Sequence, residues 1–258
     1  MGRLRQDRVR AARLIVPIAR PSLVLAVHGS AHPAYRAAIE AIRSAVVAAD
    51  AVDAEGGAAN DVRLGWLDHE QPDLATAAAA AGAAGPAGGP VVVVPLLLAA
   101  GFHARVDIPR MLATVAGTVV TRPIGPDPLL ARALVRQAAE AGATGESALV
   151  VAAAGSSDPR ALADVEEVVA MLDRHHPGPV VAGYLSGTGS RLDTEVHRLV
   201  LAGHDVIVLT YLICPGRLAD TVAATALTAG ARTVGPPIGS CSEITELIGA
   251  RWREATGF

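Results

Sequence analysis

The sequence predicts an α/β protein of two tandem parallel-sheet domains related by internal duplication, and three observations lead to this prediction. First, LVLAVHGSAHP from Leu23 to Pro33 is repeated as LVVAAAGSSDP from Leu149 to Pro159, 126 residues later. Second, VVVVPLLLAAGFH from Val91 to His103 is echoed 115 residues later by VIVLTYLICPGRL, from Val206 to Leu218. Third, short apolar runs alternate with amphipathic stretches along the chain, which is typical of βα units and parallel sheets.

The elements of the first repeat follow from hydrophobic spacing. Leu23–Val27 is an unbroken apolar run, typical of a strand buried on both faces. In Ala34–Ala49, apolar residues recur at helical spacing. Proline at the first position favours a helix start at Pro72. The further elements expected are the strands Val62–Leu67, Val91–Leu98 and Thr118–Arg122 and the helices Pro72–Ala81, Ala104–Ala116 and Asp127–Ala141.

The second repeat shows the same order of elements. Its expected strands are Ala148–Ala153, Val180–Tyr184, Val206–Ile213 and Thr233–Val234, and its expected helices are Pro159–Arg174, Ser190–Ala202, Arg217–Ala229 and Ser242–Arg253. This alternation predicts flavodoxin/Rossmann-type sheets with helices on both faces. In such sheets, ligands bind beyond the carboxyl ends of the strands.

We divide the 258 residues into three parts. Residues 1–20 form a basic extension that we expect to be flexible, 21–144 form the first domain, and 145–258 form the second. Each domain has roughly the size that a single hydrophobic core supports.

Composition excludes several classes of protein. The net charge of −3 gives no reason to expect a nucleic acid partner. The uncharged stretch Leu74–Phe102 is interrupted by three prolines, so we expect no membrane span. Two cysteines are too few for a disulfide framework, and a reduced cytoplasmic compartment is the simplest interpretation.

Histidines at strand ends distinguish the first repeat from the second. His28 follows the first strand and His103 follows the third, so both fall at the edge of the sheet where ligands bind. Asp107 lies four residues after His103, where its carboxylate can orient the imidazole or simply face solvent. The second repeat has Ala154 and Leu218 at the two histidine positions, which predicts that any chemistry is confined to the first repeat.

Two further acids follow the second strand, in GWLDHEQP. Asp68 and Glu70 are candidates for a carboxylate that assists the histidines, and His69 lies between them. A solvated loop is an equally weighted interpretation of the same residues.

The pattern as a whole resembles a known family. HGS at His28–Ser30, WLDHEQP at Trp66–Pro72, PLLLAAGFHARVDIP at Pro95–Pro109 and RPIGPDP at Arg122–Pro128 resemble the sirohydrochlorin chelatases, the class II chelatases of siroheme and cobalamin synthesis. The resemblance covers nearly the whole chain, with the second repeat as a degenerate copy of the chelatase-like domain. It implies an enzyme of the lyase class that inserts a divalent metal into the tetrapyrrole, with Fe2+ favoured and Co2+ the alternative.

The resemblance also implies roles for individual residues. His28 and His103 would bind the metal and help to remove the pyrrole protons, with Asp68 and Asp107 assisting, although the family usually has Glu at the position of Asp68. No cofactor would be permanently bound, because the metal is a substrate. The expected substrate-binding residues are Gly29, Ser30, Gly101, Arg105, Gly155, Ser156 and Ser157, with Arg160 and Arg217 as further candidates for the substrate carboxylates.

Two other functions stay open from the residues alone. Ser30, His103 and Asp107 could form a hydrolase triad, although the G-x-S-x-G elbow is missing. The same histidines could also serve a tetrapyrrole or metal carrier that binds without turnover. We expect a monomer, because the fused duplication supplies both walls of a cleft.

Overall fold

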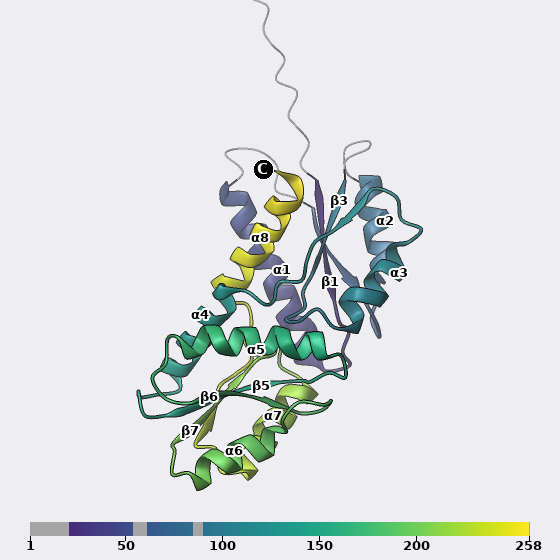
Figure 1. Ribbon diagram of the computed structural model, residues 1–258. Helices are drawn as coiled ribbons and strands as arrows, with labels where there is room; N and C mark the ends of the chain where they lie inside the picture. The colour runs from purple at the N-terminus through teal and green to yellow at the C-terminus, as the bar shows by residue number, and fades with distance from the viewer. Residues whose placement is uncertain (1–20, 54–60, 85–89, 258) are drawn as a thin grey trace, which may run out of the picture.

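The computed structural model describes residues 21–53, 61–84 and 90–257, and the predicted extension at 1–20 lies outside them. It confirms two parallel sheets of the same topology, with strand orders β2-β1-β3-β4 and β6-β5-β7-β8. The strands are β1 (Ser22–Val27), β2 (Val62–Trp66), β3 (Val91–Pro95), β4 (Thr118–Val120), β5 (Ala148–Ala153), β6 (Val180–Tyr184), β7 (Val206–Thr210) and β8 (Thr233–Val234). Figure 1 shows the two sheets in separate upper and lower units.

Helices cover both faces of each sheet, as alternating βα units require. They are α1 (Pro33–Asp53), α2 (Leu74–Ala84), the short π-helix η1 (His103–Asp107), α3 (Ile108–Leu112), α4 (Pro128–Glu140), α5 (Pro159–Asp173), α6 (Leu192–Leu201), α7 (Arg217–Thr228) and α8 (Ser242–Thr256). No helix within the described ranges has the length and apolar character needed to cross a membrane.

Side-chain alternation along β1 shows why each strand is apolar throughout. Leu23, Leu25 and Val27 join the core on the side of α1, and Val24 and Ala26 join the core on the side of α2 and α3. The core on the side of α1 continues into the second unit, whereas α6 and α7 cover a separate cluster on the far face of the second sheet.

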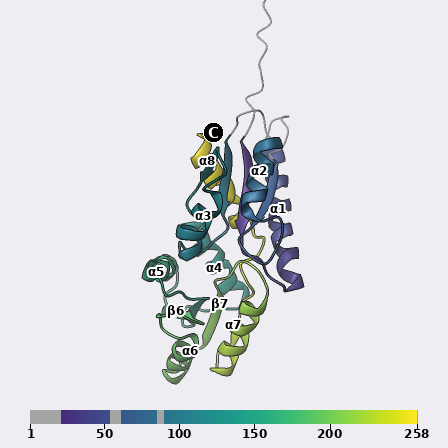
Figure 2. The same ribbon diagram turned by 90° about the vertical axis from the view of Figure 1, so that its right-hand side faces the viewer.

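The last helix of each repeat crosses to the other repeat. α4, which ends the first repeat, packs on α5 and β7, and α8, which ends the second repeat, packs on α1 and β3. Figure 1 shows α8 beside α1, and Figure 2 shows from a second side that α8 lies in the upper unit. The boundary between 144 and 145 was predicted from the two sequence repeats, and each packed unit also contains the last helix of the other repeat.

Buried polar side chains fix this exchange. Arg251 of α8 is 1% exposed and donates hydrogen bonds to the carbonyl oxygens of Pro123 and Ile124, and it pairs with the Asp127 carboxylate at 2.9 Å. At the equivalent place in the other unit, the amide of Gln137 on α4 donates to the Pro236 carbonyl oxygen. The two halves are therefore bound together at both crossings.

Several element boundaries differ from those predicted, among them β4, which ends at Val120 and not at Arg122, and α1, which runs to Asp53 and not to Ala49; three others have a clear physical reason or a bearing on the site. α2 begins at Leu74 and not at Pro72, because the Asp73 carboxylate accepts the Thr76 N–H at 2.7 Å and caps the helix there. β3 ends at Pro95 and not at Leu98, since proline has no N–H for the ladder. β7 likewise ends at Thr210, before the loop that lines the cleft described below.

The helix predicted for Ala104–Ala116 is also different. It is replaced by η1 and the short α3 because Pro109 cannot donate to the carbonyl four residues earlier; the Ile108 N–H reaches the His103 carbonyl instead.

Candidate metal-insertion site

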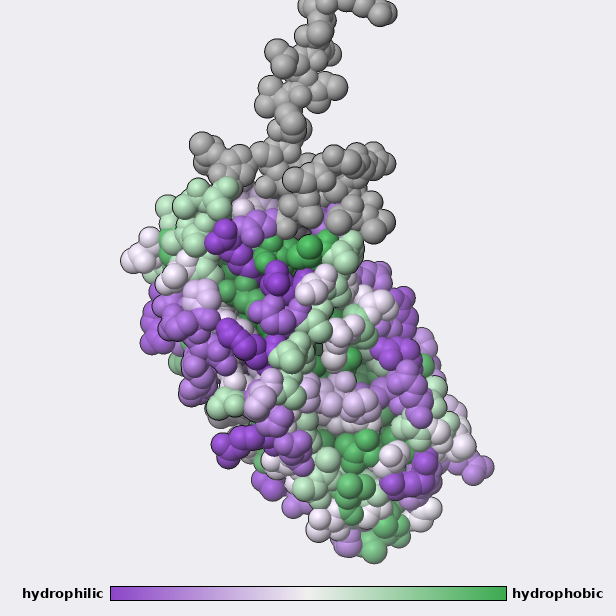
Figure 3. Space-filling view, turned by 180° about the vertical axis from the view of Figure 1, so that it is seen from behind, coloured by the Kyte–Doolittle hydropathy of each residue, from purple (hydrophilic) through white to green (hydrophobic). Residues whose placement is uncertain are grey.

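A cavity of about 660 Å³ lies between the two units, at the carboxyl ends of both sheets. Loops after β1, β2 and β3 line one side, and loops after β5 and β7 line the other. The side of the molecule seen in Figure 3 is a mixture of hydrophilic and hydrophobic residues, whereas the cavity is lined mainly by apolar side chains and glycines. Both repeats therefore contribute to one site, in the place where open parallel sheets bind ligands.

His28 is held at the end of β1 by its neighbours. A Cβ on Gly29 would lie 2.0 Å from the Asp68 carbonyl oxygen, so only glycine permits this close approach of the two loops. The Gly29 N–H donates to Asp68 Oδ1 at 2.6 Å, and the other carboxylate oxygen lies 3.6 Å from His28 Nδ1. Asp68 therefore lies beside the imidazole with its own position fixed by the backbone.

His103 has a second carboxylate behind it. Its Nδ1 lies 2.8 Å from Asp107 Oδ2, one turn along η1, and Arg110 donates to Asp107 Oδ1 at 2.8 Å. Asp107 is only 14% exposed, so it is not the freely solvated surface acid that sequence left open. The arrangement fixes the imidazole through one nitrogen and leaves Nε2 on the opposite side of the ring.

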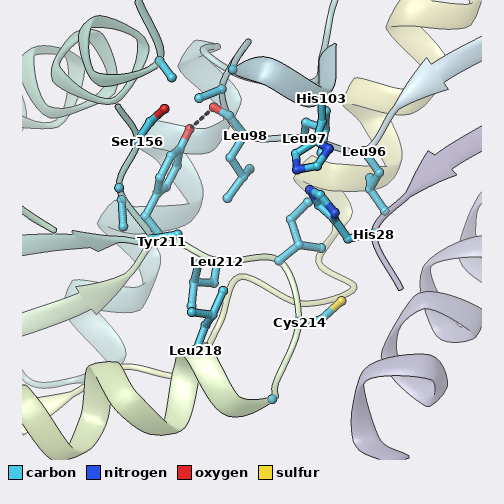
Figure 4. Close-up of a pocket in the computed structure, with 18 of the residues that line it drawn as sticks. His28, Leu96, Leu97, Leu98, His103, Ser156, Tyr211, Leu212, Cys214 and Leu218 are labelled. Atoms are coloured by element: carbon cyan, nitrogen blue, oxygen red, sulfur yellow. Dashed lines mark hydrogen bonds between the residues drawn. The ribbon is translucent and has the colours of Figure 1, made fainter. Parts of the chain in front are cut away.

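The two imidazoles meet. Their ring centroids are 4.3 Å apart at an interplanar angle of 89°, and Figure 4 shows both side chains pointing toward one another at the edge of the cavity. Burial and the neighbouring His103 lower the pKa of His28, and Asp68 partly opposes this. Below its ordinary range the pKa leaves His28 neutral near pH 7, the form that binds a metal or accepts a proton.

The donor set is small. Within the described ranges, no group of three or more His, Cys, Asp or Glu side chains is arranged to hold a metal ion. Two imidazole nitrogens form an open site, which suits an ion that is bound and then passed on. Structural metal sites in proteins usually have four protein ligands.

The second repeat supplies apolar side chains where the first supplies histidines. Ala154 and Leu218 both line the cavity, and Leu218 lies across it from the histidines in Figure 4. Leu218 is 53% exposed, and Phe102 beside His103 is 59% exposed, so two large apolar side chains border the opening of the cavity.

The predicted substrate-binding residues fall into two groups. Those that line the cavity are Gly29, Ser30, Gly101, Gly155, Ser156, Ser157 and Arg217. Arg105 and Arg160 are not among the lining residues. Arg105 donates to the Ala100 carbonyl at 2.7 Å, and Arg160 forms two 3.0 Å hydrogen bonds with the Asp158 carboxylate.

The loop after β2 also resolves a choice between two acids. Glu70 pairs with Arg36 at 3.2 Å, away from the histidines, so Asp68 is the acid that faces them. His69 lies in the left-handed region at φ 55 and is exposed, with its ring 4.0 Å from Asp68. Ser30 accepts the His32 N–H at 3.1 Å. Within the described residues, no hydrogen bond joins Ser30 to His103, so the hydrolase triad is not assembled.

Sequence reasoning missed several residues of the cleft. Tyr35, Phe102, Tyr184, Tyr211 and Cys214 all line it. The aromatic residues were available signals, because the chain contains only 3 Tyr and 2 Phe, and four of these five line one cavity.

Comparison with known proteins identifies the family. The family model described as CbiX matches residues 22–141 and again residues 148–255, so each repeat matches once. The chain belongs to the CbiX family.

Relatives of this CbiX-family chain agree with that assignment. The sirohydrochlorin cobaltochelatase of Sulfurisphaera tokodaii is 35% identical over 81 residues, which are 31% of this chain and 66% of the relative, just under two thirds of its length. Among solved structures, SirB from Bacillus subtilis with Fe3+ has a TM-score of 0.72 at 24% identity, covering 91% of this chain and 95% of SirB. CbiX, the terminal enzyme of siroheme biosynthesis in denitrifying bacteria, has a TM-score of 0.65 at 21% identity, covering 92% of this chain and 99% of its own. These two structures support the fold.

Proposed function

We propose that this chain is a sirohydrochlorin chelatase, which inserts Fe2+ or, as the alternative, Co2+ into the tetrapyrrole. The observation that supports it most directly is the pair of imidazoles 4.3 Å apart at the edge of a largely apolar cavity between two repeats. The cavity volume of about 660 Å³ falls in the range of small-molecule sites, roughly 300–1,000 Å³. Family membership and the printed names of the relatives point to the same substrate.

The chemistry follows from the side chains. Insertion removes two N–H protons from the ring and presents a divalent ion to its nitrogens. His28 and His103 are the metal-binding groups and proton acceptors in this proposal, because neutral imidazole nitrogen suits Fe2+ and Co2+. Asp68 and Asp107 orient the two rings and stabilise them once protonated. The metal is a substrate, and no permanent cofactor is required.

The second repeat forms the opposite wall in this proposal and delivers no metal. The Ser30 and Ser156 loops and Arg217 lie around the cavity, where main-chain N–H groups and a guanidinium can bind the carboxylates of the substrate. Arg217 makes no ion pair within the part of the chain that the structure describes, so its charge is available. We further propose that the protein is a monomer and that it works in a reducing cytoplasm. The free thiols of Cys214 and Cys241 support the reducing compartment.

An anaerobic absorbance assay tests the proposal. Sirohydrochlorin is mixed with the protein and with Fe2+, Co2+ or Ni2+ in turn, and the spectrum is followed against the uncatalysed reaction. We expect catalysed insertion of Fe2+ or Co2+, a fall of about 10²–10⁴-fold in His28→Ala and in His103→Ala, and continued binding of sirohydrochlorin by both variants. Binding without turnover by the wild-type protein would instead identify a carrier, and near wild-type rates in either variant would exclude that histidine from the reaction.

A further inference from the structure

The loop that leads to His103 is held from across the cleft. This loop, Leu96–Phe102, joins β3 to η1 in the first repeat. The Ala100 N–H donates to Asp164 Oδ2 at 2.7 Å, and the Tyr211 hydroxyl donates to the Leu98 carbonyl at 3.1 Å. Figure 4 shows the second of these bonds. Asp164 and Tyr211 both belong to the second repeat, so the backbone three and five residues before His103 is bonded to the half that has Ala154 and Leu218 at the two histidine positions.

The chemistry and burial of Asp164 and Tyr211 favour both hydrogen bonds. Asp164 is a half-buried carboxylate on α5, and a charged acceptor makes a shorter and stronger bond to a backbone N–H than a neutral one. Tyr211 is 2% exposed, and burial together with the negative charges of Asp164 and Asp127 raises the pKa of its phenol. Tyr211 is therefore a neutral hydrogen-bond donor near neutral pH.

Two further contacts involve the loop, one with Arg105 of η1 and one with α5, the helix that carries Asp164. The Ala100 carbonyl accepts from Arg105, and a Cβ on Gly101 would lie 3.6 Å from the Ala161 methyl group of α5. Small residues at both positions let α5 approach the loop closely enough for Asp164 to reach the backbone.

Only the second repeat supplies these anchoring groups, and only the first repeat has a loop that can receive both of them. At the offset of 126 residues that relates α1 to α5, Asp164 corresponds to Ala38. At the offset of 115 that relates the third strands and their loops, Tyr211 corresponds to Leu96 and Ala100 to Pro215, which has no N–H to donate. The first repeat thus lacks both anchoring groups, and the second lacks the amide that would be anchored.

We propose that Asp164 and Tyr211 are positioning residues, which fix the Leu96–Phe102 loop so that His103 meets His28 in the geometry needed for metal insertion. The two repeats have then specialised in complementary ways, one holding the imidazoles and the other holding their supporting loop. This inference rests on the proposed function for its catalytic part, while the anchoring itself is a property of the folded chain.

The test combines amide hydrogen exchange with kinetics in the full-length protein. The variants are Asp164→Ala, Asp164→Asn and Tyr211→Phe, with Glu167→Ala as the control, because Glu167 is an exposed acid on the same helix. Exchange is measured on the peptide covering residues 96–104, and kcat and KM for sirohydrochlorin are measured with Co2+.

We expect Asp164→Ala to speed exchange in this peptide by about 10- to 100-fold, the range for a hydrogen bond to a charged group. Its kcat should fall by about tenfold or more, with KM changed less than about twofold, since misplaced reacting groups slow the chemical step. Tyr211→Phe should show both effects at about 3- to 10-fold. Asp164→Asn should recover most of both losses, because an amide oxygen still accepts the Ala100 N–H.

Several outcomes separate this inference from the proposed function. Unchanged exchange in Asp164→Ala would show that the anchor does not form. Faster exchange with wild-type kcat would show that the anchor does not position His103, and equal effects in Glu167→Ala would show a general loss of stability. Absence of insertion by the wild-type protein would refute the proposed function, and the exchange data would still decide whether the loop is anchored.

Discussion

His28 and His103 lie next to one another, but their surroundings differ. His28 is set against a loop acid whose position is fixed by the Gly29 N–H, whereas His103 shares a single helical turn with Asp107. The pKa of His28 is lowered by burial and by the adjacent His103. A pair of adjacent imidazoles cannot both be protonated without repulsion, so their closeness itself favours the neutral forms that metal transfer requires.

The pH dependence follows from this shift. As the pKa of His28 lies below its ordinary 6.5, insertion should hold its rate down to slightly acid pH and fall only as the pH passes through the lowered pKa. Asp68 raises the pKa of His28, so Asp68→Asn should lower that pKa further and move the acid limb of the rate profile to lower pH. The amide oxygen can still accept the Gly29 N–H, which preserves the loop. NMR titration of the His28 ring and a rate profile from pH 5 to 8 measure both shifts.

Stability also falls in acid, but over a pH range that begins higher. With pH falling below about 6.5, the unfolded chain gains a proton at His28 before the folded chain does, so the free energy of unfolding decreases until the lowered pKa is reached and then levels off.

For the Asp68→Asn variant, Asp61→Asn serves as the control, because Asp61 is an exposed acid that pairs with Arg63. A rise in the His28 pKa on removal of the Asp68 charge would contradict the role assigned to that carboxylate.

At the scale of elements, tight loops at the carboxyl ends of the strands set the site. Gly29 and Gly155 open equivalent loops after β1 and β5, and a Cβ on Gly155 would lie 1.9 Å from the Ser186 carbonyl oxygen. Both positions therefore require glycine, one because of close approach alone and the other also because of its positive φ of 92.

Gly29→Ala should reduce both stability and insertion. The new methyl group would displace the Asp68 backbone, at a cost of about 1–3 kcal/mol for overpacking, and would move Asp68 away from His28. Gly82→Ala in α2 is the matched control, because its Cβ would have no neighbour nearer than 3.6 Å and helix propensity there favours alanine by up to about 1 kcal/mol. Urea unfolding and insertion rates compare the two. Wild-type stability in Gly29→Ala would mean that the loop shifts freely.

The local spacing of hydrophobic residues predicted most helices and strands. The prediction failed where a single residue changed the backbone hydrogen bonding. The run Leu23–Val27 and the spacing in Ala34–Ala49 predicted β1 and α1 because periodicity reports burial directly. The π-helix at His103–Asp107 was not predicted. Pro109 removes one backbone N–H donor, and the sequence pattern does not show how the neighbouring backbone hydrogen bonds rearrange around it. The meeting of His28 with His103 could be predicted, because carboxyl ends of neighbouring parallel strands share one edge.

The crossing of α4 and α8 could not be predicted in the same way. Each helix has an apolar face that fits the sheet of either unit, so local pattern does not choose between them. Arg251 gave a misleading signal, because arginine is rarely buried and nothing near it in the sequence indicates its partners Pro123, Ile124 and Asp127. The tyrosines Tyr35 and Tyr211 were likewise overlooked, because their contacts join segments far apart in the chain.

At the scale of the whole molecule, the crossed helices make the two repeats one folding unit. Arg251→Ala would leave the Asp127 carboxylate and two carbonyl groups without their buried donor, and should lower the free energy of unfolding by about 3–5 kcal/mol. Arg253→Ala, which removes an exposed arginine from the same helix, should change it by less than about 0.5 kcal/mol. Guanidinium unfolding measures both, and equal losses would show that Arg251 does not join the halves.

The asymmetry of the repeats leads to a prediction about adding histidines to the second one. In the His28→Ala, His103→Ala background, the changes Ala154→His and Leu218→His place the two imidazoles at the equivalent positions. We expect no recovery of insertion, because the carboxylates are missing there: Ser186 occupies the position equivalent to Asp68, and the fully buried Val222 occupies the position equivalent to Asp107.

An imidazole without a carboxylate partner has no fixed orientation or tautomer. Sirohydrochlorin binding, followed by absorbance, checks that the fourfold variant still folds around its ligand. Recovery of insertion by more than about tenfold over the His28→Ala, His103→Ala protein would contradict this expectation. It would show that two histidines in this cleft suffice without carboxylate partners, so that missing acids do not explain why only the first repeat inserts metal.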